Sequence, residues 1–180
     1  MNTTLKRLTE TAVMLGLATV LSLVTVFKAP FGGSVTAASM VPIVLIAFRY
    51  KAKWGLITGL LYGCIQLALD FGKIGSWGLS AQVFAGSVLL DYLLAFTVIG
   101  VAGFFAGKKY GILVGTLVGL GLRFVCHFLS GVILFSSFTP EGMSPIVYSI
   151  LYNGAYMLPE IIVTGAVAFI IQKSTGFLKV

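Results

Sequence analysis

The chain has 180 residues, of which 58% are hydrophobic and only 9% charged, with a formal net charge of +7 and a mean hydropathy of +1.06. A soluble domain carries about 25% charged residues, so this chain has too few to cover a water-soluble globule. The positive charge does not indicate nucleic-acid binding, because the basic residues stand in short clusters between long apolar runs. The composition therefore excludes an ordinary soluble domain and predicts an integral membrane protein.

Six apolar segments follow one another along the chain, and each is predicted to span the membrane as a helix. They cover residues 8–27, 36–48, 54–70, 80–106, 110–137 and 145–172. The second and third are short, which indicates tilt or partial burial. Gly32-Gly33, Gly75-Ser76 and the segment Thr139-Pro140-Glu141-Gly142 mark breaks between spans, and Pro145 opens the last helix. No internal repeat is visible, so residues 1–180 are predicted to form a single all-α membrane domain of six transmembrane helices.

Basic residues lie mainly on one side of the six predicted spans. Nine belong to the side of the termini, namely Lys6, Arg7, Arg49, Lys51, Lys53, Lys108, Lys109, Lys173 and Lys179. The other side has Lys28 and Lys73. Because cytoplasmic loops are enriched in Lys and Arg, both termini are predicted to be cytoplasmic. No cleavable signal peptide is predicted, because the first apolar run ends in Lys28-Ala29-Pro30 without a small-residue cleavage site.

Four ionisable side chains lie well inside the predicted spans, away from their ends: Asp91, Arg123, His127 and Glu160. A charge in hydrocarbon costs at least about 2.5–3.5 kcal/mol, so each of them must face a partner or a polar cavity. The simplest structural interpretation pairs Arg123 with Asp91, and whether Arg123 also contacts a ligand is open. Glu160 follows Pro159, where the helix loses a backbone hydrogen bond, and we predict a structural role for it, either at this break or in a pair in the inner half of the membrane.

Aromatic and amide side chains gather at the start of the last predicted span, at the level of Asp91 and His127. They are Tyr148, Tyr152, Asn153 and Tyr156. A single tyrosine near a membrane interface is ordinarily an anchor, but this group beside a buried acid and histidine predicts a ligand site open to the outside. A carboxylate with aromatic faces suits an organic cation. Asparagine and histidine offer donors and acceptors to a heteroaromatic ring.

Small residues on the first predicted helix form a second pattern. Ala12 and Gly16 are spaced so that another helix can approach closely in lipid, although packing within the chain explains the pair equally well. Residues 32–36 are either a flexible lid over the site or a plain connector. Cys64 and Cys126 lack metal-site spacing and are predicted to be small buried hydrophobes. No metal or cofactor is predicted.

Five segments resemble the ThiT family, the thiamine-specific substrate-binding S-components of energy-coupling factor (ECF) transporters. They are Thr9-Glu10-Thr11-Ala12, Gly32-Gly33-Ser34-Val35-Thr36, Leu90-Asp91-Tyr92, residues 123–128 and residues 148–154. The resemblance covers nearly the whole chain, and the last two segments are the most specific. It implies the ECF S-component fold, a place in the bacterial cell membrane and thiamine as the ligand. It also implies a transmembrane coupling subunit and two ATP-binding subunits as partners.

The resemblance further implies roles for individual residues. Positions that match the family's ligand-binding residues are Asp91, Tyr92, Arg123, His127, Tyr148 and Asn153, and Ala12 and Gly16 match its motif for docking the transmembrane partner. The chain departs from the family pattern where Asp91 replaces a glutamate and Phe135 replaces a tryptophan. A tryptophan of the first outer loop has no counterpart either, since Phe31 is the nearest aromatic residue. Trp77 is a candidate to supply the missing ring face.

Two alternatives to thiamine binding are considered. One is an S-component for another water-soluble vitamin or for a thiamine-related heteroaromatic compound. The other is an intramembrane hydrolase that uses His127 with Ser130 or another buried serine. It is disfavoured because Ser130 follows His127 by three residues on one helix and no Gly-x-Ser-x-Gly elbow is present. The chain is not predicted to be an enzyme. It has no Gly-x-x-x-x-Gly-Lys-Ser/Thr phosphate loop, so ATP hydrolysis is assigned to partner subunits.

Overall fold

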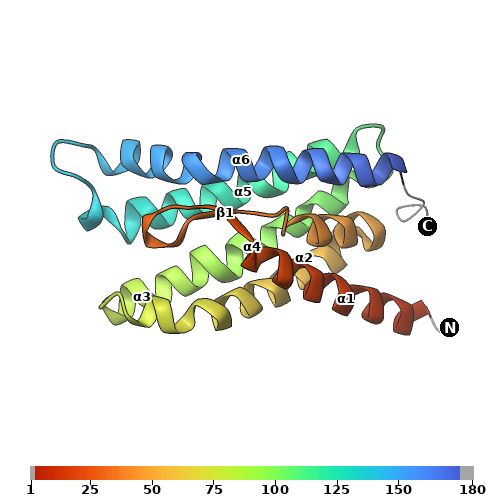
Figure 1. Cartoon of the computed structure of the whole chain (residues 1–180), viewed down its shortest axis with the longest axis horizontal. Coiled ribbons are helices and arrows are strands. Elements are labelled where there is room, and N and C mark those ends of the chain that lie inside the picture. Colours follow the sequence, from red (N-terminus) through yellow and green to blue (C-terminus); the bar gives the residue numbers. More distant parts are fainter. Residues whose placement is uncertain (1–2, 175–180) are drawn as a thin grey trace.

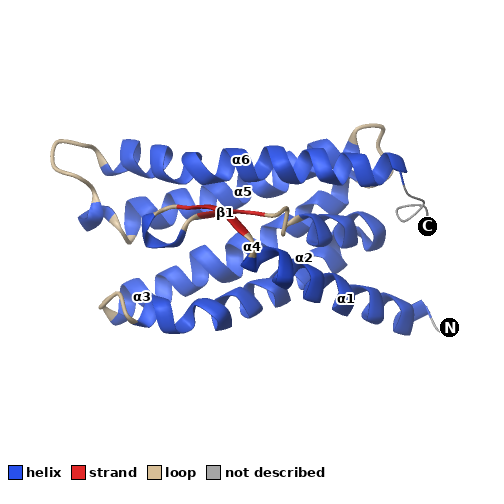
Figure 2. Ribbon diagram, viewed as in Figure 1, coloured by secondary structure: helices blue, strands red, loops and turns tan. Residues whose placement is uncertain are grey.

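Long helices run roughly along one axis of the computed structural model, and a short two-stranded hairpin lies among them (Figures 1 and 2). The structure describes residues 3–174, without the side chain of Phe31, so the predicted cytoplasmic Lys179 lies outside the description. The main elements are α1 (Thr3–Leu23), β1 (Thr25–Lys28), β2 (Ser34–Thr36), α2 (Val41–Gly75), α5 (Gly111–Ile133) and α6 (Pro145–Ser174). The start of α1 and the end of α6 lie at the same end of the molecule (Figure 1).

Helix α2 folds back on itself at Lys51, whose backbone is not helical (φ 70°, ψ 170°). A Cβ built on Gly55 would lie 2.5 Å from the Cβ of Ala47, whereas eight residues of straight helix span about 12 Å. Residues 41–50 and 52–75 are therefore two arms of a sharp turn. They correspond to the predicted spans 36–48 and 54–70, although the first arm begins at Val41 and the second continues to Gly75.

The predicted span 80–106 is continuous, but it changes helix type along its length. It consists of α3 (Ala81–Ser87), a π-helix η2 (Val88–Leu94), α4 (Ala95–Thr97) and a 3₁₀-helix η3 (Val98–Phe105). The segment begins where the backbone N–H of Val83 donates to the Oγ of Ser80 over 3.3 Å, which caps the first turn. A π-helical turn is rare and is frequently found at functional sites. Here it carries Asp91 and Tyr92.

Glycines bring α2 and this mixed helix into backbone contact. A Cβ on Gly59 would lie 2.3 Å from the carbonyl oxygen of Phe96, and a Cβ on Gly100 would lie 2.2 Å from the carbonyl carbon of Gly55. No side chain fits at either position unless the helices move apart. Such close approach is how helices associate in lipid, where the hydrophobic effect does not hold them together.

The hairpin corrects the all-α prediction, because the first helix ends at Leu23 and not at residue 27. The next residues, Thr25-Val26-Phe27, are β-branched or aromatic and favour a strand. Strands β1 and β2 pair antiparallel, with Thr25 opposite Thr36, Phe27 opposite Val35 and Lys28 opposite Ser34, and with an irregularity between Thr25 and Phe27. A 3₁₀ turn, η1 (Pro30–Gly32), joins them.

The outer surface of the bundle is apolar, as expected for a membrane protein. Among residues 3–174, four helical segments have the length and hydropathy to cross a membrane: Val41–Gly75, Ala81–Phe105, Gly111–Ile133 and Pro145–Ser174. Large side chains such as Leu117 on α5 and Ile162 on α6 are 59% and 68% exposed, so they face the lipid. Cys64 is exposed as well, contrary to the prediction that it is buried.

Candidate functional site

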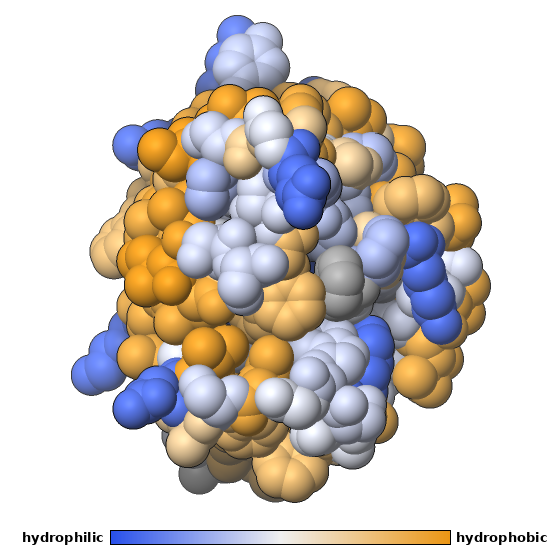
Figure 3. Space-filling view, turned by 90° about the vertical axis from the view of Figure 1, so that its left-hand side faces the viewer, coloured by the Kyte–Doolittle hydropathy of each residue, from blue (hydrophilic) through white to orange (hydrophobic). Residues whose placement is uncertain are grey.

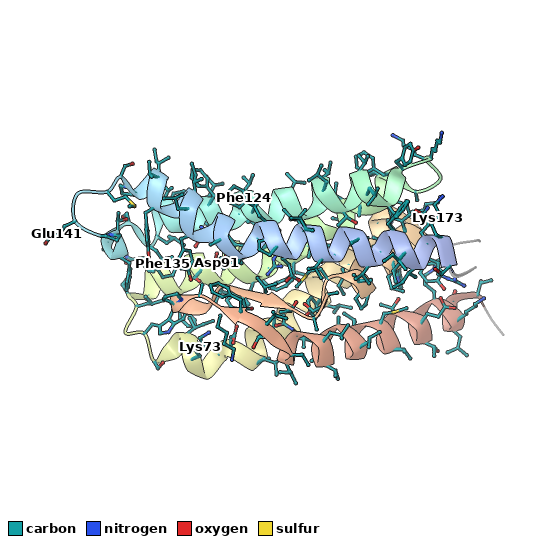
Figure 4. The ribbon with its side chains drawn as sticks, turned by 45° about the horizontal axis from the view of Figure 1, so that its top comes forward. Lys73, Asp91, Phe124, Phe135, Glu141 and Lys173 are labelled. Carbon is teal, nitrogen blue, oxygen red and sulfur yellow. The ribbon has the colours of Figure 1, made fainter. Side chains whose placement is uncertain are left out.

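A cavity of about 170 Å³ lies between the hairpin, the second arm of α2, η2, α5 and α6. An engineered cavity of about 150 Å³ holds a benzene molecule, so the space accommodates a ring of that size. All eight residues predicted to bind ligand lie in its wall: Trp77, Asp91, Tyr92, Arg123, His127, Phe135, Tyr148 and Asn153. Figure 4 shows Asp91 and Phe135 near each other inside the bundle. At this end of the molecule, hydrophilic side chains gather inside a more apolar rim (Figure 3).

The carboxylate of Asp91 is hydrogen-bonded to three side chains in the cavity wall. Its Oδ2 accepts from the hydroxyls of Ser87 over 2.8 Å and Ser130 over 2.5 Å. Its Oδ1 lies 2.9 Å from Nδ1 of His127. Ser87 stands one turn before Asp91, and Ser130 reaches it from α5. Three hydrogen-bonding groups therefore hold the carboxylate in one orientation.

Asp91 pairs with His127 and not with Arg123, which corrects the simplest structural interpretation of the sequence. Within the described part of the chain, no ion pair of Arg123 is found. Its guanidinium lies 4.5 Å from the ring centroid of Phe96, and its Nε is buried without a hydrogen-bond partner. The reason is geometric, because His127 and the two serines already occupy both oxygens of Asp91.

His127 keeps one ring nitrogen free beside the cavity. When Nδ1–H donates to Asp91, Nε2 of the neutral ring becomes an acceptor. This Nε2 is buried and has no hydrogen-bond partner among the described residues. A buried polar atom that lacks a partner in a ligand-binding cavity is a candidate ligand contact.

Three tyrosines from successive turns of α6 form an aromatic wall. The ring centroids of Tyr148 and Tyr152 are 5.9 Å apart, and those of Tyr152 and Tyr156 are 5.8 Å apart. Tyr156 also meets the His127 ring edge-on at 6.0 Å. Tyrosines four residues apart lie on one helix face, so the wall follows directly from the sequence spacing. On the far side of the cavity, the rings of Phe135 and Phe138 are 5.8 Å apart.

Asn153 links the aromatic wall to α5 and is 4% exposed. Its Nδ2 donates to the carbonyl oxygens of Ser149 over 2.9 Å and His127 over 3.3 Å, and its Oδ1 accepts from the Tyr156 hydroxyl over 2.6 Å. Both ends of the amide are thus hydrogen-bonded to protein groups. This arrangement fixes the position of Tyr156 and His127 relative to each other.

The connection between β1 and β2 lies over the cavity and contacts α6. The hydroxyl of Tyr152 donates to the carbonyl oxygen of Pro30, and the N–H of Gly33 lies 3.4 Å from the same hydroxyl. A Cβ on Gly33 would lie 2.4 Å from the ring of Tyr156. On the other side, a Cβ on Gly32 would lie 3.4 Å from the Trp77 ring. The segment is therefore packed against the site on two sides.

Glu160 on α6 is hydrogen-bonded to the same hairpin and is 1% exposed. Its carboxylate accepts from the N–H of Thr36 over 2.8 Å and from the Thr36 hydroxyl over 2.9 Å. Of the structural roles predicted for Glu160, satisfying the Pro159 break is not the one observed, and the carboxylate instead binds Thr36 of the hairpin. The physical reason is that a carboxylate has no hydrogen to donate to the carbonyl group that proline leaves unpaired.

Several wall residues were not predicted from the sequence. Asp70 accepts a hydrogen bond from the Tyr92 hydroxyl over 3.0 Å, but at the end of a span it resembles an ordinary interfacial charge. Ser87 could have been predicted from the sequence, because it stands four residues before Asp91 and therefore on the same face of a helix. The described cavity wall contains three acidic residues, Asp70, Asp91 and Glu160, against one arginine. The cavity is therefore acidic, although the chain as a whole has a net charge of +7.

The small residues of α1 face outward. Ala12 is exposed, and a Cβ on Gly16 would meet no heavy atom within 4 Å. Packing within the chain, which was one explanation of their spacing, is therefore not their role. This strip of α1 remains open to lipid or to another helix.

The apolar bundle and the buried acidic cavity define an integral membrane protein that binds a small molecule. A sequence profile described as "Thiamine transporter protein (Thia_YuaJ)" matches residues 8–179. The chain therefore belongs to this family of thiamine transporters, as its resemblance to the ThiT family predicted, and this family consists of transporters rather than enzymes. In agreement, Ser130 donates to Asp91, so the hydroxyl is not aligned on His127 as the hydrolase alternative requires.

Similar proteins carry related names. The thiamine transporter ThiT of Bacillus subtilis is 39% identical over 178 residues, which cover 91% of this chain and 88% of that one. The thiamine transporter ThiT of Lacticaseibacillus paracasei is 26% identical over 144 residues, which cover 69% of this chain and 66% of that one. The solved structure of ThiT from Listeria monocytogenes superposes with a TM-score of 0.78 at 25% identity and covers 98% of both chains.

Proposed function

We propose that the chain is the thiamine-binding S-component of an ECF-type vitamin importer, which captures thiamine from outside the cell. In this proposal residues 1–180 form one domain that crosses the membrane six times, with both termini in the cytoplasm. The turn at Lys51 supports this count, because it divides α2 into two oppositely directed arms. The orientation is supported by the nine basic residues on the side of the termini.

The observation that carries the proposal is the carboxylate of Asp91, held by Ser87, Ser130 and His127 in the wall of an acidic cavity. Thiamine contains a permanently cationic thiazolium ring. A fixed negative charge in a site of low dielectric constant attracts such a cation more strongly than it does in water. The tyrosine wall of α6 adds aromatic faces, which bind an organic cation through the ring quadrupole.

The aminopyrimidine ring of thiamine would be recognised by the groups around His127. Its exocyclic amino group is a donor, and the free Nε2 of His127 is an acceptor. Arg123, whose Nε also lacks a hydrogen-bond partner among the described residues, supplies donors for the ring nitrogens. Asn153 would act mainly by keeping His127 and Tyr156 in place.

Residues 30–36 would act as a lid. Gly32 and Gly33 line the cavity of about 170 Å³ and lie beside Trp77 and Tyr156. A molecule with two rings needs this segment to open for entry and to close again afterwards. The hydrogen bonds from Thr36 to Glu160 would hold one end of the lid fixed while the rest moves.

Tryptophan fluorescence tests the assignment of the ligand and of the cavity together. The chain has two tryptophans, of which Trp77 lies in the cavity wall and Trp54 packs against Thr11. Thiamine at micromolar concentration is expected to quench the fluorescence of the wild type and of Trp54→Phe. In Trp77→Phe the quenching is expected to disappear, while calorimetry still detects binding.

Riboflavin is the matched control ligand and should leave the fluorescence unchanged. Absence of quenching by thiamine in the wild type, or a response to riboflavin of equal size, would contradict the proposal. Quenching that is lost in Trp54→Phe and kept in Trp77→Phe would move the ligand out of this cavity.

The partners proposed for transport are a transmembrane coupling subunit and two ATP-binding subunits, as in ECF importers. The coupling subunit would dock on the outward strip of α1 around Ala12 and Gly16. The support is that this strip presents small side chains and no packing partner of its own.

A further inference from the structure

A second pocket lies at the end of the bundle where α1 begins and α6 ends, away from the ligand cavity (Figure 1). It lies between the turn of α2, the connection from η3 to α5, and the end of α6. Its lining residues are Phe48, Arg49, Lys51, Ala106, Gly107, Lys108, Lys109 and Gln172. Four of these residues are basic and none is acidic. Figure 4 shows that Lys173, the neighbour of Gln172, lies at the opposite end from Glu141 and Phe135.

Three of the four basic residues keep their positive charge uncompensated. Arg49 is neutralised by Glu10, with 2.8 Å between its Nε and the carboxylate. Lys51, Lys108 and Lys109 are exposed, and no carboxylate pairs with them in the described part of the chain. The ammonium groups of Lys108 and Lys109 lie 5.1 and 5.3 Å from the rings of Phe105 and Tyr110. A ring face attracts a cation but does not cancel its charge.

The backbone around these lysines adds two features. Helix α5 begins at Gly111, two residues after Lys109, and its dipole places partial positive charge at this end. Its first N–H, that of Gly111, donates to the carbonyl oxygen of Lys108 over 3.0 Å, so the dipole and not a free amide is what this end offers an anion. Lys51 is held at φ 70° by the sharp turn of α2, so its side chain leaves the backbone from a fixed, unusual position. Strained residues of this kind cluster at binding sites.

Apolar surface flanks the pocket on the side of the lipid. Phe104 precedes the lining residues of the η3–α5 connection and is 66% exposed, and Ile170 precedes Gln172 and is 59% exposed. A soluble anion would make no favourable contact with these apolar side chains. A phospholipid would contact them, because its acyl chains lie along the helices while its phosphate reaches the basic residues at the membrane surface.

We propose that this pocket binds the phosphate group of an anionic phospholipid from the leaflet at the end of the termini. Lys51, Lys108 and Lys109 would contact the phosphate, and the exposed side chains of η3 and α6 would contact the acyl chains. This inference does not depend on the identity of the ligand in the cavity.

The test is native mass spectrometry of the purified full chain in detergent with added phosphatidylglycerol or phosphatidylcholine. The wild type is expected to retain at least fivefold more phosphatidylglycerol than phosphatidylcholine. The triple variant Lys51→Gln, Lys108→Gln, Lys109→Gln is expected to lose this preference. The matched control also removes three lysines, by Lys6→Gln, Lys28→Gln and Lys53→Gln, and should keep it.

Circular dichroism and elution volume show whether both triple variants are folded. If the first triple variant does not fold, the single variants Lys108→Gln and Lys109→Gln are tested in the same way, and each should reduce retention at least twofold. Equal retention of the two lipids by the wild type, or equal losses in both triple variants, would overturn the proposal. Displacement of the lipid by millimolar inorganic phosphate would also overturn it, because a soluble anion would then be the ligand.

Discussion

At the scale of the residue, Asp91 owes its position to groups that stand one turn away or on a neighbouring helix. Ser87 is local, whereas Ser130 and His127 arrive from α5. Together they orient both oxygens of a carboxylate that is one methylene shorter than the glutamate expected from the family pattern. The shorter side chain thus keeps a fixed charge at the cavity.

Neutralising this charge should weaken ligand binding. We predict that Asp91→Asn raises the Kd for thiamine at least tenfold, or about 1.4 kcal/mol, because the amide no longer attracts the thiazolium cation. Isothermal titration calorimetry measures the change. Glu141→Gln removes an acid at the tip of the loop before α6, away from the cavity (Figure 4), and should leave the Kd unchanged. Wild-type affinity in Asp91→Asn would mean that the cation binds elsewhere.

At the scale of the element, the segment from Ala81 to Phe105 both carries residues of the cavity wall and packs closely against α2. Its first half widens into the π-helix η2, which carries Asp91 and Tyr92 into the cavity wall. Its second half packs its backbone against α2 through Gly100. The functional residues are therefore positioned by a helix that is anchored by close glycine contacts.

A side chain at this contact should separate the two helices. We predict that Gly100→Ala lowers the stability by about 1–3 kcal/mol, as expected for overpacking, because the new Cβ would lie 2.2 Å from the backbone of Gly55. Thermal unfolding in detergent measures the loss. Gly121→Ala on α5 is the matched control, because a Cβ there meets nothing within 4 Å. Equal melting temperatures for the two variants would contradict this account of the packing.

At the scale of the whole molecule, the two ends of the bundle are built for different tasks. One end holds the acidic cavity under the hairpin. The other end, where α1 begins and α6 ends, carries most of the basic side chains of the described residues (Figure 1). Between the two ends, α1 presents its small residues outward, so a partner can contact this helix without touching the ligand.

This separation predicts that a substitution on α1 can abolish docking of the partner subunit without weakening thiamine binding. Ala12→Arg should leave the thiamine Kd within twofold of the wild type, because the exposed side chain is not in the cavity wall. Thiamine uptake by cells or proteoliposomes that contain the partner subunits should fall to background, because a long charged side chain blocks close helix approach. If Ala12→Arg abolished thiamine binding, the middle of α1 would have to be part of the site, and not only Ser22 near its end, which lies in the cavity wall.

The sequence alone determined the membrane environment, the approximate limits of the apolar segments and the residue types of the site. These follow from local properties: apolar length sets a membrane span, and an ionisable residue within a span has to face a polar site. The one-turn spacing of the tyrosines on α6 follows from helical periodicity.

Only the tertiary structure decided how these residues are connected. The partner of Asp91 is His127 and not Arg123, Glu160 holds Thr36, and Asp70 meets Tyr92. Each of these contacts joins separate elements, so its existence depends on how the helices pack. The hairpin and the π-helix are likewise stabilised by neighbours that no local pattern specifies. The sequence thus determined which groups lie in the membrane, and the packing of α2, α5 and α6 decided which of them meet.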